Sequence, residues 1–239
     1  MHALLSASGA HRWLKCPPSA RLEENLPARK SDAADEGTLA HEICELKLRK
    51  YCIEPMGVRS FNSKLKKLRE NPLFQEEMLR HTDAYIDYIA AEIHGYSSSP
   101  YVAAEKRVDY SDYVPEGFGT GDCIIIGGNL LHIIDFKYGK STKVTAENNP
   151  QMMLYALGAY SEYGFLYPID TVKITILQPR IDGISEDRMT IEELLKWGED
   201  IKPIAKLAFK GEGEYTSGEH CRFCRGKALC SQYLSGDII

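Results

Sequence analysis

The chain has 239 residues, of which 44% are hydrophobic and 26% are charged, and its formal net charge is −5 at pH 7. This composition is typical of a globular domain with a real hydrophobic core, and the acidic balance argues against a protein that coats nucleic acid non-specifically. No apolar run is long enough to span a bilayer, and the first residues lack the apolar core of a signal peptide, so we expect no membrane contact.

The N-terminal part of the chain, residues 1–95, is predicted to be helical. In its central helix Leu39, Ile43 and Leu46 recur at helical spacing behind Ser31 and Asp32, which favour a helix start. The basic run "KLKKLRE" (64–70) is interpreted as the solvated face of a helix. The expected helices span residues 8–15, 33–50 and 73–94.

The pattern changes after this part, where β-branched and aromatic residues predict strands. The second and third strands are joined by a tight turn and are therefore antiparallel, and the strand after the next helix is expected to return parallel to part of the sheet. The fold class that follows is α/β, a mixed central sheet flanked by helices. The expected strands are 101–110, 121–128, 129–139 and 170–178, and the expected helices are 150–163 and 190–209.

The hairpin "DCIIIGGNLLHIID" (122–135) has a register that its turn fixes. If the Gly-Asn dipeptide at 128–129 forms a two-residue turn of the kind that hairpins favour, Asp122 lies directly opposite Asp135. Their Cβ atoms are then about 4.5–5.5 Å apart on one face. Two like charges in this position destabilise a sheet, and a divalent cation between them is the simplest reason for the pair. A turn at 127–129 would instead put the two aspartates on opposite faces.

Strand alternation adds Lys137 to the face of Asp135 and turns His132 to the other face, where we expect a packed strand residue and not a ligand. Carboxylates can hold Mg²⁺ or Mn²⁺, which acidifies a bound water and offsets charge on a phosphate, and the lysine can act on that water or on the developing charge. This set is typical of metal-assisted phosphodiester hydrolysis. The alternative interpretation is an exposed ion pair of Asp135 and Lys137 at a strand end, with Asp122 in a turn.

Three of the seven cysteines lie close together near the C-terminus in a C-x2-C-x5-C spacing, which supplies three thiolate ligands. On spacing alone the fourth ligand stays open: Cys16 or the adjacent His220 would complete a zinc site, and a fourth thiolate would complete an iron–sulfur cluster. The odd cysteine count fits a reducing cytoplasm. The clustered residues are Cys221, Cys224 and Cys230, and the remaining Cys44, Cys52 and Cys123 are interpreted as buried apolar residues.

Motifs along nearly the whole chain occur in the order of a known family. The segment "SASGAHRWLKCP" leads from a Ser-x-Ser to a Cys-Pro, and "EGTLAHEI", "AAEKRV", "GTGD", "IDFK" and "QMMLYA" follow it. Together they resemble the PD-(D/E)xK nucleases, specifically the RecB-like branch with an iron–sulfur cluster. That branch includes CRISPR-associated RecB-like exonucleases, AddB-type helicase–nuclease subunits and phage relatives. The resemblance implies a restriction-endonuclease-like αβββαβ core.

The resemblance also implies roles for individual residues. Lys137 would act on the attacking water or on the transition-state charge, and Glu105 would hold a second or a water-bridged metal ion. Gln151 and Tyr155, at i and i+4 on one helical face, would position the DNA backbone or Lys137. The implied ligands of Mg²⁺ or Mn²⁺ are His41, Asp122, Asp135 and the carbonyl of Phe136.

For the cysteines, the resemblance implies that Cys16 is the fourth ligand of a [4Fe-4S] cluster. Such a clip closes a loop of roughly two hundred residues, a constraint worth roughly 5 kcal/mol in the chain-entropy model of cross-links. We therefore expect a single nuclease domain over residues 1–239, with a helical part at 1–95, the nuclease core at 96–210 and a C-terminal iron–sulfur segment at 211–239 joined to Cys16.

The implied function is that of a metal-dependent DNA nuclease, an exonuclease on single-stranded DNA or DNA ends, in phage recombination, repair or defence. The implied partners are DNA and recombination or helicase proteins. The alternative is a catalytically inactive subunit, stabilised by an iron–sulfur cluster or by zinc, that binds nucleic acid or a partner protein on a nuclease scaffold.

Overall fold

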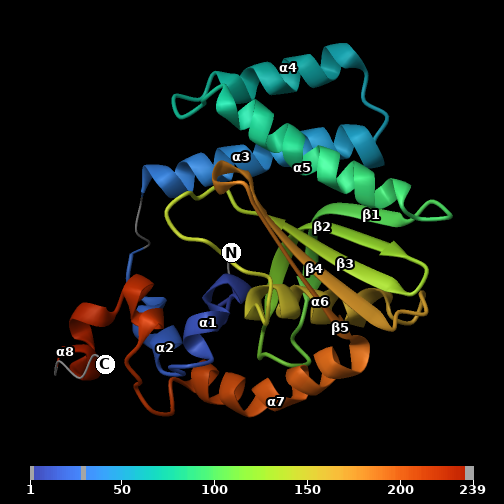
Figure 1. The fold of residues 1–239 in the computed structure, drawn as a ribbon. Coiled ribbons are helices and arrows are strands. Elements are labelled where there is room, and N and C mark those ends of the chain that lie inside the picture. The colour runs from blue at the N-terminus through green and yellow to red at the C-terminus, as the bar shows by residue number, and fades with distance from the viewer. Residues whose placement is uncertain (1–2, 28–30, 235–239) are drawn as a thin grey trace.

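The computed structural model describes residues 3–27 and 31–234, and its centre is a five-stranded sheet with the strands in chain order (Figure 1). Neighbouring strands are antiparallel except for β3 and β4, which are parallel. The sheet is therefore mixed, and the predicted α/β class is confirmed. The strands are β1 (Tyr101–Asp109), β2 (Phe118–Gly127), β3 (Leu130–Phe136), β4 (Thr171–Gln178) and β5 (Gly183–Thr190).

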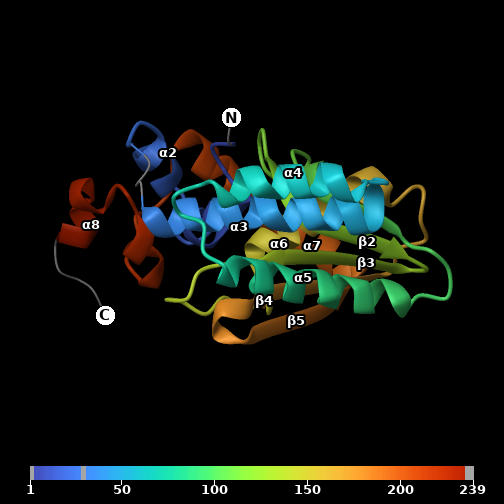
Figure 2. The same cartoon turned by 90° about the horizontal axis from the view of Figure 1, so that it is seen from above.

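Helices cover both faces of the sheet (Figures 1 and 2). On one face α3 (Asp32–Leu48) and α5 (Glu77–His94) pack against the strands, and α4 (Val58–Arg69) lies over α3. On the other face lie α6 (Pro150–Tyr163) and α7 (Ile191–Lys210), next to the short helices α1 (Ala10–Trp13) and α2 (Ser19–Glu24). The C-terminal segment, which ends in α8 (Ser231–Leu234), returns to α1 and α2. In the described part of the chain no helix is long and apolar enough to cross a bilayer.

The sheet buries apolar side chains on both faces. Ile124, Ile126 and Ile133 belong to the core beneath α6 and α7, whereas Ile125 and Ile134 belong to the core beneath α3 and α5. Near-continuous apolar runs of this kind are typical of strands in a sheet whose two faces are both covered by other elements. Each such isoleucine contributes roughly 1.5–3 kcal/mol when fully buried. This packing fixes the start of β2 and the end of β3, where the candidate site lies.

Polar side chains at the N-termini fix where three of the long helices begin. Ser31 accepts a hydrogen bond from a backbone N–H in the first turn of α3, at 3.2 Å. Asn149 does the same for α6 and so positions Gln151 in its first turn. Thr190 and Glu193 form a reciprocal capping box at the start of α7. Such caps typically contribute about 1 kcal/mol each.

The predicted hairpin register is confirmed. Cys123 pairs with Ile134, and Gly128 has a φ of 59°, as a primed hairpin turn requires. One position beyond that pair, the register places Asp122 opposite Asp135.

The sequence-based prediction omits α2, α8 and β5, and it indicates α4 only through the basic run 64–70, interpreted as a helix face, of which residues 64–69 lie in α4. The predicted helix at 8–15 is wrong in extent: a 3₁₀ turn (Ala7–Gly9) precedes α1, which ends at Trp13. The predicted helix at 73–94 begins only at Glu77. The remaining elements lie where they were predicted, with ends that shift by at most three residues.

His132 lies on the face opposite Asp135 and is packed, as predicted. Its Nε2 lies 2.8 Å from Thr175 Oγ1 and its Nδ1 lies 3.3 Å from Glu92 Oε2, while Lys173 Nζ lies 3.0 Å from Glu92 Oε1. Hydroxyl, imidazole and carboxylate follow one another as in a catalytic triad. Both His132 and Thr175 are 0% exposed, so no substrate reaches them. This network therefore stabilises the contact between α5 and the sheet.

Candidate metal centre and active site

Two carboxylates lie opposite each other on adjacent strands. One position past the Ala104–Cys123 pair, Glu105 of β1 faces Asp122 of β2. Glu105 has a φ of 47°, in the left-handed region that a residue other than glycine rarely adopts within a strand. Such a conformation costs of order 1–3 kcal/mol and persists only where the surrounding structure enforces it. The fold therefore holds the Glu105 carboxylate at this position against a local penalty.

The side chains of β1 and β2 no longer alternate strictly between the two faces of the sheet at Glu105 and Asp122. Ala104 and Cys123 face α3 and α5, whereas Val108 packs in the core beneath α6 and Gly119 lies against the ring of Tyr155 on α6. Strict alternation with a period of two would put Ala104 and Val108 on the same face. As at a β-bulge, the irregularity re-aims the side chains at this point. The carboxylates thereby come within reach of side chains from both helical layers.

His41 on α3 completes a group of possible metal ligands. Its Nδ1 lies 3.3 Å from Asp122 Oδ2, and its ring meets the ring of Phe136 edge-on at 5.5 Å. Ligand atoms of His41, Glu105 and Asp122 all lie within 4.8 Å of one another. Among the described residues this is the one group of three or more His, Cys, Asp and Glu side chains that meets this limit.

The electrostatics of this group are those of crowded negative charges beside an imidazole. Burial and the charge of Asp122 raise the pKa of Glu105 to about 7. Burial opposes the charged form of His41, but the charge of Asp122 and its hydrogen bond to the ring outweigh burial and raise the pKa of His41 to about 9. A bound cation would take the place of these protons and offset the repulsion between the carboxylates.

A second group, which comprises Asp135, Lys137, Gln151 and Tyr155, adjoins the first. Gln151 Nε2 donates to Asp135 Oδ1 at 3.3 Å and to the Tyr155 hydroxyl at 3.2 Å, and Gln151 Oε1 accepts from Lys137 Nζ at 3.3 Å. Burial raises the pKa of Asp135, against the opposing effect of Lys137. Burial would lower the pKa of Lys137, but the charges of Asp135 and Asp122 outweigh burial and raise it. The lysine is therefore held as a cation.

Asp122 joins the two groups, because its Oδ2 accepts a hydrogen bond of 2.8 Å from the backbone N–H of Phe136, next to Asp135. The predicted ligand role of Asp135 stays a prediction, although the group within this 4.8 Å limit contains Glu105 and not Asp135. Lys137 and Gln151 already bind the Asp135 carboxylate. The role of the Phe136 carbonyl as a ligand stays a prediction.

The donor set fits a divalent cation. Carboxylates and an imidazole together suit Mn²⁺, whereas Mg²⁺ prefers oxygen ligands alone. Asp135 is 2% exposed, and its buried Oδ2 has no hydrogen bond of acceptable geometry among the described residues, although Lys137 Nζ lies 3.0 Å away as an ion-pair partner. A buried carboxylate oxygen without a hydrogen bond normally needs another partner.

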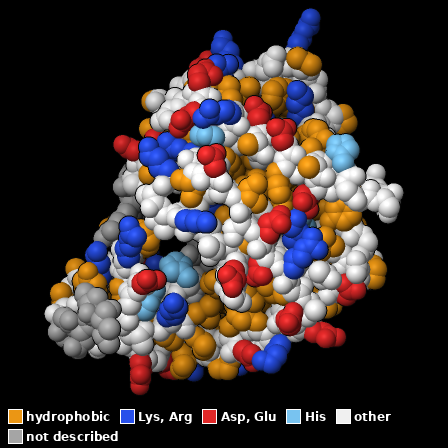
Figure 3. Space-filling view, viewed as in Figure 1, with side chains coloured by type: hydrophobic (Ala, Val, Ile, Leu, Met, Phe, Trp, Pro, Cys, Tyr) orange, Lys and Arg blue, Asp and Glu red, His pale blue; other side chains and the backbone are white. Residues whose placement is uncertain are grey.

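A groove of about 650 Å³ leads from Lys137 and Gln151 to the C-terminal segment. Figure 3 shows a hollow on this face of the molecule with Lys, Arg and His side chains around it. No local sequence motif predicts the groove, because three segments far apart in the chain form it. Besides Lys137, its ionisable lining residues are His11, Lys15, Lys143, His220 and Arg222, against Glu147 and Glu219.

The structure brings Cys16 and the three C-terminal cysteines together around one narrow cavity. No three of these described sulfur atoms lie within 4.8 Å of one another. His220 Nε2 lies 3.0 Å from the Thr216 carbonyl oxygen, which leaves Nδ1 as the ring nitrogen that could bind a metal, so the zinc alternative with His220 stays open. Of the other cysteines, Cys44 and Cys123 are buried and Cys52 is half-buried.

Contacts other than the cysteines also hold the terminal segments together. The Glu23 carboxylate is 4% exposed and binds both the Arg12 guanidinium and the backbone N–H of Arg225. The Arg225 guanidinium donates to the carbonyls of Glu23 and Leu26 at 2.9 and 2.7 Å. The C-terminal segment is therefore docked on α2 by a buried, charge-assisted network.

Comparison with known proteins gives a family match over almost the whole chain. The family model described as "Protein of unknown function (DUF2800)" matches residues 2–236. Among solved structures, the crystal structure of SSO0001 is similar at 13% sequence identity and a TM-score of 0.36, over 94% of this chain and 96% of that chain. A TM-score this low carries no argument about function.

Proposed function

We propose that this chain, which belongs to the DUF2800 family, is a metal-dependent DNA nuclease. The observation that carries the proposal is the convergence of His41, Glu105 and Asp122 within 4.8 Å of one another. This group adjoins the buried Asp135–Lys137 pair at the head of a largely cationic groove. Acidic residues, a lysine and a basic path together suit a substrate that carries phosphodiester charge.

The reaction we propose is hydrolysis of one phosphodiester bond. A water oxygen forms a bond to phosphorus while the bond from phosphorus to one sugar oxygen breaks, and that oxygen takes up a proton. Mg²⁺ or Mn²⁺ held by His41, Glu105 and Asp122 would acidify the water and offset charge on the phosphate. Lys137 would stabilise the charge that develops on the phosphate oxygens.

The groove supports a single strand or a strand end as the substrate. Besides its cations it exposes the ring of Phe223, which is 54% accessible and can stack on a base. Gln151 would orient Lys137 and Asp135 at the head of the groove, with Tyr155 behind it. On this basis the proposal includes exonucleolytic cleavage, and helicase or recombination proteins as partners.

The four cysteines around the cavity support a [4Fe-4S] cluster as a second, structural cofactor in a reducing compartment such as the cytoplasm. The cluster would be bound by Cys16, Cys221, Cys224 and Cys230, and it would lie beside the groove, because His220 lines both the groove and the cysteine cavity. The proposed role is to hold the far wall of the groove in place.

The test is a cleavage assay with Mn²⁺ and with Mg²⁺ on a labelled single strand, a linear duplex and a closed circle. The parent is compared with Asp135→Asn and Lys137→Ala, and Lys140→Ala serves as a matched control, because this lysine is exposed and lies outside the groove lining. We expect metal-dependent cleavage by the parent and by Lys140→Ala, and at least about a hundredfold loss in the other two.

Two results would contradict the proposal. The first is a parent that cleaves none of the substrates with either metal, and the second is equal cleavage by the parent and both site variants. A parent that binds DNA without cleaving it would instead support the alternative, a nucleic-acid-binding subunit on a nuclease scaffold.

A further inference from the structure

Helix α4 concentrates positive charge on a chain whose net charge is −5. Its sequence, "VRSFNSKLKKLR", carries five Arg and Lys and no Asp or Glu. Arg69 is paired with Glu76. Within the described residues the other four have no acidic partner within 4.0 Å, and their side chains are exposed: Arg59, Lys64, Lys66 and Lys67.

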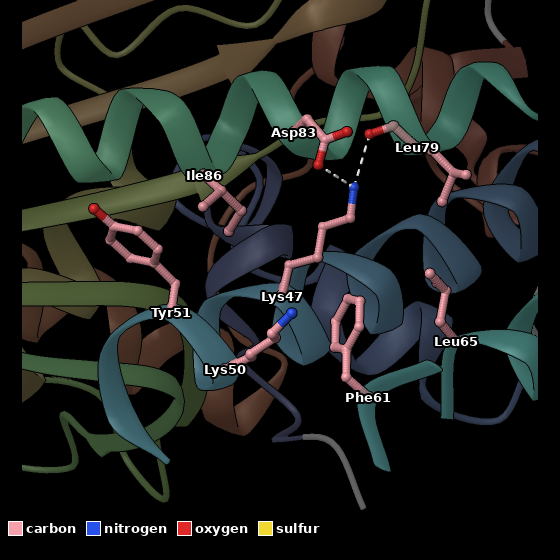
Figure 4. A pocket seen from close by; sticks show the side chains of 8 residues that line it. All are labelled: Lys47, Lys50, Tyr51, Phe61, Leu65, Leu79, Asp83 and Ile86. Carbon is pink, nitrogen blue, oxygen red and sulfur yellow. Dashed lines mark hydrogen bonds and ion pairs between the residues drawn. The ribbon is translucent and has the colours of Figure 1, made fainter. Parts of the chain in front are cut away.

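The apolar side of α4 is already in use. Phe61 and Leu65 line a cavity of about 510 Å³ together with residues of α3 and α5, as Figure 4 shows. Lys50 Nζ lies over the Phe61 ring at 4.0 Å, and Leu68 packs against the core beneath α3 and α5. These three apolar residues recur at i, i+4 and i+7, so they share one face of the helix. The opposite face of α4 is therefore turned to solvent.

The solvent face presents cations in a row. Arg59 and Lys66 are seven residues apart, which is nearly two helical turns, so they lie about 10.5 Å apart along one side of the helix. Lys67 flanks this row, and Ser63 lies between its ends. No acidic residue of α4 interrupts the row.

The composition of this face selects the chemistry of its partner. Protein interfaces have an apolar centre and are depleted in lysine, whereas phosphates are bound by Arg, Lys, Ser and Asn side chains. A helix that lies on a membrane inserts its apolar side, but Phe61, Leu65 and Leu68 of α4 pack inward. The face therefore fits the sugar–phosphate backbone of a nucleic acid better than a protein or a lipid surface.

The solvent face of α4 has no aromatic side chain, and this indicates that its partner is a duplex and not a single strand. Proteins that bind single strands stack bases on exposed aromatic rings, and the one aromatic residue of α4, Phe61, is turned inward. We infer that α4 is a contact for the backbone of duplex DNA, made through Arg59, Lys66 and Lys67. This inference goes beyond the proposed function, because the surface of α4 contains none of the residues of the candidate metal centre. It would also hold if the protein bound DNA without cleaving it.

The test is fluorescence anisotropy with a labelled blunt 20-base-pair duplex in EDTA, between 50 and 200 mM NaCl. The variant Arg59→Ala/Lys66→Ala/Lys67→Ala is compared with Lys196→Ala/Lys206→Ala/Lys210→Ala on α7, which removes the same charge elsewhere. Because each phosphate contact contributes about 0.9 to the salt slope, we expect the slope of the α4 variant to fall by about 2.7 and its affinity at 50 mM salt to fall by at least about tenfold. The α7 variant should bind like the parent.

Three results would overturn the inference. The first is that the parent shows no duplex binding, and the second is that the α4 and α7 variants lose the same amount of duplex affinity. The third is that the parent binds a single strand more tightly than the duplex and the α4 substitutions weaken both by the same factor. Circular dichroism establishes that each variant is folded, and Lys66→Glu/Lys67→Glu provides a second test with an opposite charge. EDTA prevents metal-dependent cleavage and every proposed metal ligand is intact. Failure of the inference is thus distinct from failure of the nuclease proposal.

Discussion

Glu105 and Asp122 face each other on β1 and β2 at the point where both strands change the phase of their side chains. In the metal-free protein the ionised pair destabilises the folded state, because burial and the charge of Asp122 raise the pKa of Glu105 to about 7. A group with a raised carboxyl pKa destabilises the folded state increasingly as the pH rises from about 4.5 through 7. The destabilisation is therefore complete at pH 8 and absent at pH 4.

From this pair we predict opposite effects of Glu105→Gln on stability and on metal binding. Without metal at pH 8 the variant should be more stable by about 1 kcal/mol, after allowance for solvent screening, and the gain should vanish at pH 4. Mn²⁺ at a hundred times its Kd should stabilise the parent by about 2.7 kcal/mol and the variant far less. Thermal unfolding with and without Mn²⁺ measures both effects. Glu199→Gln on α7 is the control, and an equal Mn²⁺ response in Glu105→Gln would exclude Glu105 as a ligand.

Gln151 and Tyr155 should contribute unequally to cleavage. Gln151 contacts both Lys137 and Asp135, whereas Tyr155 reaches them only through Gln151. We expect Gln151→Ala to lower the cleavage rate by about 10- to 100-fold, as for a residue that orients its neighbours, and Tyr155→Phe to lower it by less. Rates at saturating Mn²⁺ test this order. The opposite order would mean that Tyr155 contacts the substrate itself.

The buried network at α5 should make the protein sensitive to acid. The close contacts of Glu92 with the His132 imidazole and the Lys173 ammonium lower the pKa of Glu92 to about 2, although burial opposes them. This stabilisation is complete above about pH 4.5 and is lost as the pH falls towards 2. Burial lowers the pKa of His132, so protonation of this imidazole in the unfolded chain removes further stability below about pH 6.5.

We therefore predict that Glu92→Gln costs about 2 kcal/mol at pH 7 and much less at pH 3. Urea unfolding at the two pH values measures the difference, and Glu162→Gln on the surface of α6 is the matched control. A cost that is the same at both pH values would show that the carboxylate charge is not what stabilises this contact.

Two Gly→Ala substitutions in helices should change stability in opposite directions. At Gly158 of α6 an added Cβ would lie 2.9 Å from Val108 Cβ and 3.0 Å from the Asp109 carbonyl oxygen of β1, so Gly158→Ala should cost about 1–3 kcal/mol. At Gly37 of α3 nothing lies within 4 Å, so Gly37→Ala should gain about 0.5–1 kcal/mol. Melting temperatures decide the matter, and a stabilised Gly158→Ala would contradict the close packing of α6 on β1.

The cysteine cavity makes a prediction that is independent of cleavage. Protein purified without oxygen should contain iron and sulfide and absorb broadly in the visible range, and Cys16→Ser should lose both. Cys52→Ser, which changes a half-buried cysteine outside the cavity, should keep them. A colourless parent with one equivalent of zinc would reject the cluster.

The hairpin shows how far sequence can lead. Its turn residues fixed the register that brings Asp122 and Asp135 together, because a Gly-Asn turn allows one alignment of the two strands. Strand alternation also predicted correctly that His132 lies on the face opposite Asp135. No local sequence pattern predicts the positive φ of Glu105, because a residue other than glycine rarely adopts it. The group of possible ligands within 4.8 Å contains Glu105 and not Asp135, and the predicted ligand role of Asp135 stays a prediction.

The prediction omits strand β5, and it indicates helix α4 only through its basic run at 64–70, without its bounds. The sequence of β5, "GISEDRMT", has no apolar run, and exposure alternates along it because only pairing with β4 makes it a strand. Helix α4 has too few apolar residues to stand out, because it covers α3 from outside and is itself exposed. In both cases tertiary contacts decide the local structure.

Because the five strands lie side by side in the order in which they occur along the chain, a ribosome would release them in the order of their places in the sheet. Each new strand can join the free edge left by its predecessor, and none has to be inserted between two that have already paired. The last step has a different character. Arg225 can reach Glu23 only after nearly the whole polypeptide has been made, so the cysteine cavity would be completed only on a nearly finished chain.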